Sequence, residues 1–343
     1  MILFGVDITK RPMIIAEIGI NHNGDVNLAK KMIEEAKKSG ADVVKFQVFS
    51  PERLYVESWA KERKVVFGDE EMTLWDFIDK VKLSWDDLKA LKKYAEDLGI
   101  GFLATPFSFE DADFLEEIGV QAYKIASMDL NNTPFLKYVA RKEKPIILST
   151  GMGSIGEIEE AVRAILNEGN DQIVILHCVS LYPPKPEQVH LRAIETLKRL
   201  FDFPIGFSDH TIGVHIPIAA IALGAQVIEK HFTLDKNLPG PDQKVSMTPE
   251  ELKILRKAAD EVWMALGRSW KVLTNEELEV ARVARRSLVA KRYLKRGHIL
   301  SEDDVVFKRP GNGIPPDEIR YVIGRKLKRD IPEDEIIAWE DLE

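Results

Sequence analysis

The chain has 343 residues, a formal net charge of −8 at pH 7 and one cysteine, Cys178. This length allows one large domain and a smaller one, or two or three domains of ordinary size. The acidic balance argues against a nucleic-acid partner. One cysteine excludes an intramolecular disulfide, and no apolar run approaches the ~18 residues of a membrane span. We therefore expect a cytoplasmic protein with no signal peptide and no membrane partner, in which Cys178 is buried in a strand.

Short apolar runs rich in β-branched residues alternate with stretches of helical periodicity along the first ~260 residues. Strand–helix alternation repeated eight times predicts a (β/α)8 TIM barrel. A doubly wound sheet is the alternative, but polar residues follow nearly every predicted strand, as a ring-shaped site requires. The predicted strands are 13–18, 42–48, 101–105, 122–126, 145–149, 173–178, 204–208 and 225–229, and the predicted helices are 27–39, 84–98, 110–118, 155–167, 190–200 and 216–223.

Two stretches depart from this alternation. Residues 50–83 are rich in charge and aromatics and predict an inserted functional loop after the second strand, because plain connections are usually short. After Gly267 the pattern changes to a charged helical linker, 268–284, and a small β-rich domain, 285–343. Basic residues outnumber acidic ones across 282–329. The positive charge of that surface either offsets the negative charge of the barrel, 1–267, or faces an anionic ligand or a partner subunit.

The catalytic groups of a TIM barrel come from the C-terminal ends of its strands. Lys45 and Lys124 would converge there with several hydroxyls, which suits a phosphate or a carboxylate, although each lysine could instead pair with a structural carboxylate. Glu17 is the candidate general base or water-positioning group, and its alternative role is a charge partner for a lysine. The remaining polar candidates are Gln47, Thr105, Ser127, Ser149, Ser180, Tyr182, Ser208 and Asp242.

Two histidines, His210 and His231, each follow a predicted strand closely. Imidazoles delivered by consecutive strands to one rim predict an open metal site, whereas a lone histidine would more often be a hydrogen-bonded core residue. Two histidines with water and substrate oxygens suit Mn²⁺ or a related ion, since zinc usually takes three or four protein ligands. Asp209 is expected to orient an imidazole. His22 is a weaker third candidate for a role in this site, and it could equally be a loop residue that shapes the rim.

Several motifs together resemble the sialic acid synthases, and the tail is similar to the antifreeze-like (SAF) domain that these enzymes carry. The resemblance covers nearly the whole chain, in order. The motifs are Ala16-Glu17-Ile18-Gly19-Ile20-Asn21-His22-Asn23-Gly24, Lys45-Phe46-Gln47, Thr105-Pro106-Phe107, Lys124-Ile125-Ala126-Ser127, Ser208-Asp209-His210-Thr211, Glu229-Lys230-His231-Phe232 and Pro239-Gly240-Pro241-Asp242, with Arg285-Arg286-Ser287-Leu288 and Lys308-Arg309-Pro310-Gly311-Asn312-Gly313-Ile314 in the tail.

This resemblance implies a condensation of phosphoenolpyruvate with an open-chain N-acylhexosamine. It implies a divalent metal at His210 and His231, with Mn²⁺ expected and Mg²⁺ or Co²⁺ as alternatives, and a water held by Glu17. It also implies a domain-swapped homodimer whose small domain covers the partner barrel, with Arg309 reaching the N-acyl group. By motif, phosphoenolpyruvate would contact Lys45, Thr105, Lys124, Ser127, Ser149 and Ser208, and the sugar would contact Gln47, Tyr182 and Asp242.

One residue departs from the family pattern. Sialic acid synthases that use N-acetylmannosamine commonly carry an asparagine two residues before the Tyr-Pro that follows the sixth strand, and here Ser180 stands there. A serine still donates to phosphate, but the sugar specificity is left open among sialic, legionaminic, pseudaminic and spore-coat sugar synthases. A pyruvate-dependent aldolase, either metal-dependent or using a Schiff base at Lys124, and a carbohydrate- or ice-binding protein are more distant alternatives.

Overall fold

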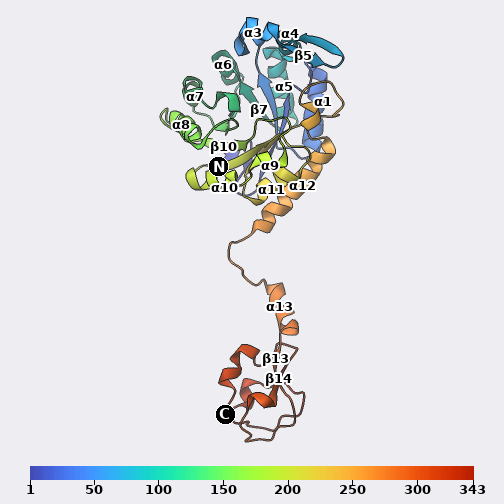
Figure 1. Ribbon diagram of the computed structural model, residues 1–343, viewed down its shortest axis with the longest axis vertical. Coiled ribbons are helices and arrows are strands. Elements are labelled where there is room, and N and C mark those ends of the chain that lie inside the picture. The colour runs from blue at the N-terminus through green and yellow to red at the C-terminus, as the bar shows by residue number, and fades with distance from the viewer. The chain divides into compact units, whose positions relative to one another are not determined.

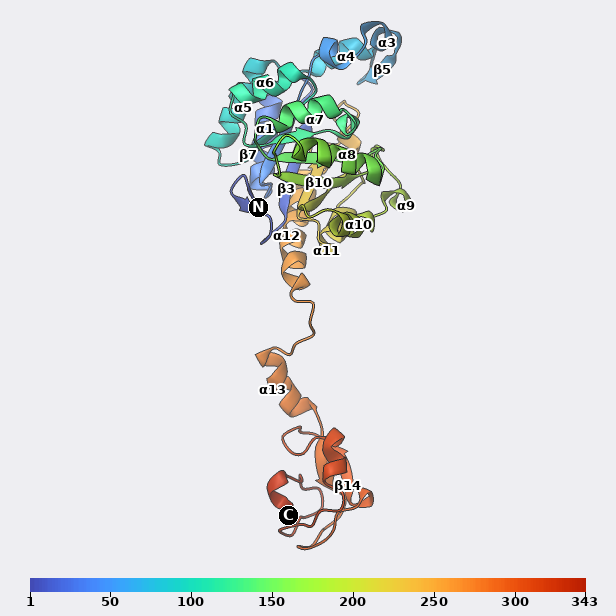
Figure 2. The same ribbon diagram turned by 90° about the vertical axis from the view of Figure 1, so that its left-hand side faces the viewer.

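The computed structural model describes residues 1–343, which form two compact units, Met1–Gly267 and Arg268–Glu343. In the first unit eight parallel strands close into a barrel, and Figures 1 and 2 show helices packed around its outside. The predicted TIM barrel is therefore confirmed. Its strands are β3 (Met13–Gly19), β4 (Val43–Val48), β7 (Gly101–Pro106), β8 (Tyr123–Ile125), β9 (Ile146–Ser149), β10 (Ile173–Cys178), β11 (Ile205–Asp209) and β12 (Val227–His231).

The connecting helices begin at polar caps that the sequence supplies. Ser84 and Ser154 each accept a backbone N–H three residues on and form capping boxes with Asp87 and Glu157, an arrangement that satisfies amides otherwise left without partners. The helices that cover the barrel are α1 (Val26–Lys38), α5 (Trp85–Asp97), α6 (Phe109–Glu117), α7 (Thr133–Ala140), α8 (Ile155–Leu166), α10 (Ala193–Leu200), α11 (His215–Ala222) and α12 (Pro249–Leu266).

Most predicted boundaries differ from the structure by no more than one residue, and two larger differences bear on the site. The last strand runs two residues beyond the predicted end, because its ladder with β3 continues until His231 lies opposite Glu17. The predicted helix 190–200 begins only at Ala193, because His190 has a left-handed backbone (φ 48°) after the short α9 (Pro186–Val189). His231 is therefore the final residue of its strand, and not a residue of the following loop.

Alternation along the strands separates two apolar layers. In β3, Ile14 and Ala16 pack outward in a cluster with helix residues such as Met32. Met13 and Ile15 pack inward with residues of the other strands and of the hairpin β1 (Ile2–Leu3) and β2 (Val6–Asp7). Because successive side chains point to opposite faces of a strand, the next inward position on β3 is Glu17.

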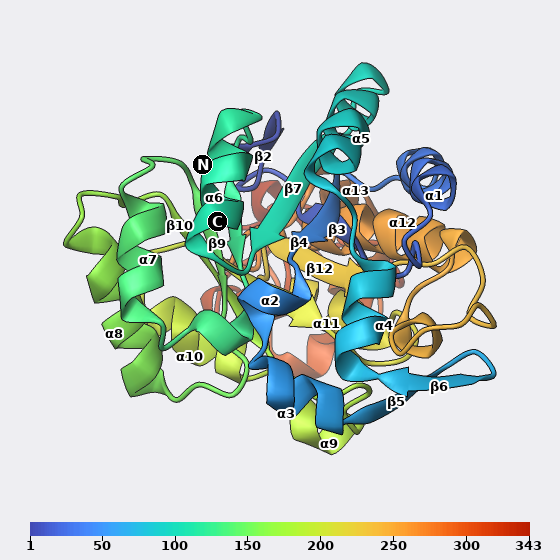
Figure 3. The ribbon, with the colours of Figure 1, turned by 90° about the horizontal axis from the view of Figure 1, so that it is seen from above.

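The segment between β4 and α5 forms a small substructure and not a plain loop. It contains α2 (Pro51–Leu54), α3 (Glu57–Glu62), the hairpin β5 (Lys64–Phe67) and β6 (Glu70–Thr73), and α4 (Leu74–Val81). Phe49, Phe67 and Phe77 lie in an apolar cluster separate from the barrel core. Figure 3 shows this insertion, in blue, on the same unit as the barrel strands.

The second unit has its own apolar core. The charged helix α13 (Asn275–Ala284) precedes an antiparallel pair of strands, β13 (Ser287–Ala290) and β14 (Val305–Lys308). Short 3-10 turns and isolated bridges connect the rest, and Leu288, Leu327 and Ile337 lie at its centre. None of the helices in the structure combines the length and the apolar character that a bilayer span requires.

Candidate active site

The inward positions of the barrel strands change from apolar to polar near the C-terminal ends. Glu17 follows Met13 and Ile15 at intervals of two, and Lys45 follows Val43 in the same way. The other strands except β10 repeat this change, so that polar side chains from different strands meet inside one end of the barrel. In β10 the last inward residue is Cys178. The remaining inward polar residues are Gln47, Thr105, Lys124, Ser149, Ser208, Glu229 and His231.

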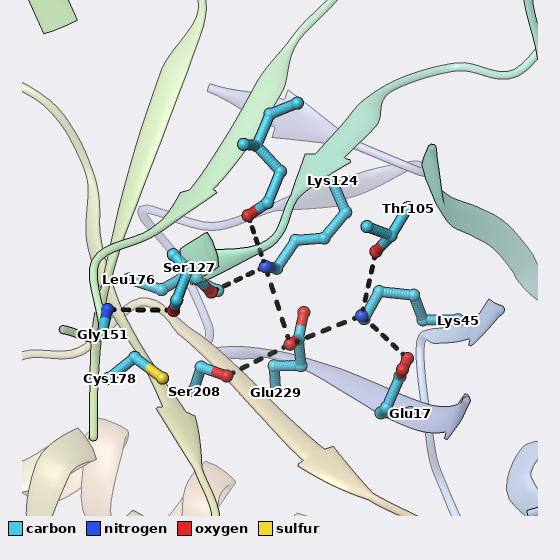
Figure 4. A network of polar contacts seen from close by, with 12 residues as sticks. Glu17, Lys45, Thr105, Lys124, Ser127, Gly151, Leu176, Cys178, Ser208 and Glu229 are labelled. Atoms are coloured by element: carbon cyan, nitrogen blue, oxygen red, sulfur yellow. Dashed lines mark hydrogen bonds and ion pairs between the residues drawn. The ribbon is translucent and has the colours of Figure 1, made fainter. Parts of the chain in front are cut away.

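Two lysines and two carboxylates form a buried cluster at the centre (Figure 4). Lys45 Nζ lies 2.9 Å from Glu17 Oε2 and 3.6 Å from Glu229 Oε1. Lys124 Nζ lies 3.8 Å from the same Glu229 oxygen, and that oxygen also accepts a hydrogen bond from Ser208 Oγ at 3.1 Å. Glu229 thus connects both lysines.

Hydroxyls of neighbouring strands complete the contacts of the lysines. Lys124 Nζ donates to Ser149 Oγ at 2.6 Å and to the Ile125 carbonyl at 2.8 Å. Lys45 Nζ donates to Thr105 Oγ1 at 3.3 Å. A buried charged amine surrounded by hydroxyls suits a phosphate or carboxylate ligand.

The surroundings of the two lysines shift their pKa values in opposite directions. Burial lowers the pKa of Lys124 to about 8, although the Glu229 carboxylate opposes this. Burial acts on Lys45 in the same direction, but the carboxylates of Glu17 and Glu229 outweigh it and raise the pKa of Lys45 above its usual range. For Glu229, burial is outweighed by Lys124 and Lys45, so its pKa is lowered and it stays ionised. Lys45 is a permanent cation, and Lys124 titrates near neutral pH.

The two histidines lie side by side at the edge of this cluster. The centroids of His210 and His231 are 5.5 Å apart, and the Tyr182 ring lies 4.1 Å from that of His210. His210 Nδ1 lies 3.0 Å from the Val179 carbonyl, which can only accept, so Nδ1 carries the proton and Nε2 keeps its lone pair. His231 Nδ1 is buried without a hydrogen-bond partner, 3.8 Å from Asp242 Oδ2.

These groups line one cavity of about 620 Å³. Glu17 also accepts a hydrogen bond from Gln47 Nε2 at 2.9 Å within it. Arg309 lies in the second unit, where it is exposed. The cavity brings together every other predicted site residue: Glu17, Lys45, Gln47, Thr105, Lys124, Ser127, Ser149, Ser180, Tyr182, Ser208, His210, His231 and Asp242.

One secondary expectation about this rim is wrong, and one open alternative is decided. Asp209 does not orient an imidazole, because its outward position directs the carboxylate to Lys230 Nζ at 2.7 Å and to Thr211. His22 does not line the cavity. It is buried, and its Nδ1 accepts from the Gly24 amide at 3.0 Å, so it shapes the loop after β3. Burial lowers the pKa of His22 to about 4.

Two further features of the cavity bear on the sequence predictions. Cys178 is buried in β10, as predicted, and it also lines the cavity. Glu229 is the residue that the sequence predictions omitted from the site. Its signal was present, because it stands two residues after inward Val227 and two before His231, and strand alternation therefore places all three on one face.

Comparison of the chain with known protein families and with known proteins agrees with this geometry. The model of the NeuB family matches residues 32–271, and that of the SAF domain matches residues 285–343. The chain belongs to the NeuB family. This confirms the family resemblance drawn from the strand-end motifs and the β-rich SAF domain predicted at the C-terminus.

Relatives of this NeuB-family chain are named as sugar-acid synthases. An N,N′-diacetyllegionaminic acid synthase of Campylobacter jejuni is 43% identical over 334 residues, which cover 96% of this chain and 99% of the relative. A human N-acetylneuraminate-9-phosphate synthase is 38% identical over 340 residues, covering 95% and 91%. The crystal structure of an N-acetylneuraminic acid synthetase of Leptospira borgpetersenii in complex with citrate aligns with a TM-score of 0.72 at 36% identity, covering 79% and 90%.

Proposed function

We propose that this protein joins phosphoenolpyruvate to an open-chain N-acylhexosamine, with addition of water, to give a nine-carbon 2-keto sugar acid and phosphate. The observation that carries this proposal is the placement of Lys45 and Lys124 in the same cavity as His210 and His231. An anion site beside a pair of imidazoles suits a reaction between an enol phosphate and an aldehyde. The names of the relatives support the same class of product.

Phosphoenolpyruvate would occupy the floor of the cavity, which is the part formed by Lys45, Lys124 and the hydroxyls around them. Its phosphate and carboxylate match the two ammonium groups, and the hydroxyls around them supply neutral donors. Binding exchanges the present contacts of the lysines with Glu17 and Glu229 for contacts with substrate anions. The hydroxyls proposed for this role belong to Thr105, Ser127, Ser149, Ser180 and Ser208.

A divalent cation fits beside the floor. The lone pair of His210 Nε2 and the unpartnered His231 Nδ1 are two nitrogen donors in one cavity. The chain has no cluster of three or more metal-binding side chains, so water and substrate oxygens would complete the coordination. An ion such as Mn²⁺, with Mg²⁺ or Co²⁺ as alternatives, supplies a Lewis acid that polarises the aldehyde.

The bonds and protons of the reaction balance with the groups present. C3 of phosphoenolpyruvate forms a bond to the aldehyde carbon, water oxygen adds to C2, and the C2–O bond to phosphate breaks. The water loses two protons, of which one reaches the former aldehyde oxygen and the other leaves with phosphate. Glu17 is the proposed base and water holder, because Gln47 and Lys45 fix its carboxylate toward the cavity.

The sugar would meet Gln47, Tyr182 and Asp242 above this floor. We further propose a homodimer in which the SAF domain covers the partner barrel and Arg309 reaches the N-acyl group. Apolar side chains of the segment 268–284 support this homodimer, because they are exposed within one chain and a partner subunit would cover them. Trp270 is 81% and Val283 is 70% exposed.

The test is release of phosphate. The protein is incubated with phosphoenolpyruvate labelled with ¹⁸O at the bridging position, Mn²⁺ and a panel of N-acylhexosamines. We expect phosphate that retains the label, because the C–O bond breaks, and no phosphate from the His231→Ala variant. Absence of phosphate with every sugar would refute the synthase, and condensation of free pyruvate would indicate an aldolase. A protein that only binds carbohydrate would retain binding after His231→Ala.

A further inference from the structure

A fully buried ion pair directly precedes the two histidines of the cavity. Asp209, the last residue of β11, and Lys230 of β12 lie opposite each other in the strand ladder, and the ammonium of Lys230 is 2.7 Å from the carboxylate of Asp209. Neither side chain is exposed. The next residues along the two strands are His210 and His231. Because neighbouring side chains of a strand point to opposite faces, the ion pair lies on the outer face of the barrel and reaches the imidazoles only through the backbone.

The same charged groups also hold the residue that follows His210. Lys230 Nζ donates a hydrogen bond to the Thr211 carbonyl. The carboxylate of Asp209 accepts from the Thr211 amide at 2.9 Å and from its hydroxyl at 3.1 Å. We call these three residues, Asp209, Thr211 and Lys230, the clamp. His210 therefore lies between two residues that both bind Lys230, and Lys230 is itself the residue before His231.

The clamp acts where the strand ladders end. On one side, the ladder between β12 and β3 continues to His231, which lies opposite Glu17. On the other side, the last registered pair of β11 and β12 is Asp209 with Lys230, and His210 lies one residue beyond it. The barrel therefore fixes the backbone of His231, whereas the side chains of the clamp fix the backbone on both sides of His210. A buried polar network whose members bind one another in this way is rigid.

We propose that the clamp sets the backbone position of His210 relative to His231 and thereby the affinity for the divalent cation. This inference rests on the metal site of the proposed function. Asp209 and Lys230 are positioning residues, since neither lines the cavity and their hydrogen bonds join them to each other and to Thr211. Stability alone does not account for the pair, because a buried ion pair is often no more stabilising than apolar residues of the same volume. Directional contacts from one ammonium to both neighbours of His210 provide the fixed geometry that a metal-binding imidazole requires.

The test separates metal affinity from stability. Electron paramagnetic resonance of free Mn²⁺ measures the affinity and the urea midpoint measures the stability of Lys230→Met, Asp209→Asn and the double variant. Each single variant leaves one buried charge unpaired and should lower both quantities. The double variant leaves no charge of the pair, so its urea midpoint should return most of the way to the wild-type value. Its Mn²⁺ affinity should nevertheless stay at least about fivefold below that of the wild type, because the groups that hold His210 are still missing.

The matched control is a buried ion pair at the opposite end of the barrel. Asp42 directly precedes β4, and its carboxylate lies 3.3 Å from Arg256 with both side chains largely buried. Asp42→Asn should lower the urea midpoint as the single clamp variants do, while leaving Mn²⁺ affinity unchanged. A double clamp variant whose Mn²⁺ affinity recovers together with its stability would show that the clamp is only structural, and would overturn the proposal.

The measurements on the wild type distinguish this inference from the proposed function. If the wild-type protein binds no Mn²⁺, the proposed metal site fails and the clamp proposal fails with it. If the wild type binds Mn²⁺ and releases phosphate but the double variant binds Mn²⁺ equally well, only the clamp proposal fails. Should the double variant not fold, Thr211→Val decides, because it removes one hydroxyl contact with Asp209 and leaves no charge unpaired. That variant should lose about threefold in Mn²⁺ affinity, and an unchanged affinity would overturn the proposal.

Discussion

The ammonium group of Lys124 lies 3.8 Å from a carboxylate oxygen of Glu229, with both side chains buried inside the barrel. The same oxygen is 3.6 Å from Lys45. One buried carboxylate therefore pairs with two cations. The stability of the barrel and the charge state of its two lysines both depend on this residue.

Replacing the buried carboxylate should destabilise the protein. We expect Glu229→Gln to lower the free energy of unfolding by about 3 kcal/mol, because loss of one partner leaves a buried charge uncompensated. The matched control is Glu159→Gln, which breaks the exposed pair with Arg163 and should cost less than about 1 kcal/mol. Urea unfolding measures both, and equal costs for the two variants would contradict the prediction.

Binding of phosphoenolpyruvate should weaken at alkaline pH. Burial lowers the pKa of Lys124 to about 8, so its positive charge is present below that pH and is lost above it. We expect kcat/KM for phosphoenolpyruvate to fall by about tenfold per pH unit above about 8. Lys124→Arg keeps its charge through this range and should remove the fall. A fall that persists in Lys124→Arg would assign the titration to another group.

Both rim histidines should be needed for metal binding. We expect His210→Ala and His231→Ala each to lower Mn²⁺ affinity by at least about tenfold, since neither variant retains the paired donors. Electron paramagnetic resonance of free Mn²⁺ reports this without any turnover. The control is His177→Asn, because His177 Nε2 is bonded to the Val189 carbonyl at 2.7 Å and the ring lies outside the cavity. Unaltered Mn²⁺ affinity in both alanine variants would contradict the site.

Acid should destabilise the barrel through His22. Its pKa is about 4 in the folded chain against 6.5 when exposed. Between these values the unfolded chain binds a proton that the folded chain does not, so the free energy of unfolding decreases as pH falls from 6.5 to 4. The loss should reach about 3 kcal/mol. His22→Asn should flatten this slope, while the exposed His215→Asn should leave it, as urea unfolding at several pH values would reveal.

Two inactive variants should complement each other if the proposed homodimer exchanges SAF domains. Arg309→Ala and Glu17→Gln remove groups that would serve the same active site from different subunits. After mixing and subunit exchange, about a quarter of all sites would combine an intact Glu17 with an intact Arg309, as random reassortment predicts. Recovery of phosphate release on mixing supports the exchange. Mixtures no more active than the separate variants would argue against it.

Strand periodicity allowed much of this protein to be predicted. Eight apolar runs separated by amphipathic helices predict the barrel, and polar residues at the ends of those runs predict a shared rim. Thirteen of the predicted residues line one cavity for that reason. The prediction failed for Asp209, because adjacent positions of a strand point to opposite faces and only Ser208 faces inward.

The barrel, the SAF domain and most of the residues that line the cavity follow from the amino-acid sequence, because they depend on local periodicity and on motifs contiguous in the chain. The contact by which Glu229 joins Lys45 to Lys124 follows from the folded barrel alone, since these residues come from three separate strands. The same holds for the insertion, whose Tyr55, Leu74, Phe77 and Ile78 line the cavity. Both outcomes depend on side chains distant in sequence meeting in a closed barrel, which no single segment specifies.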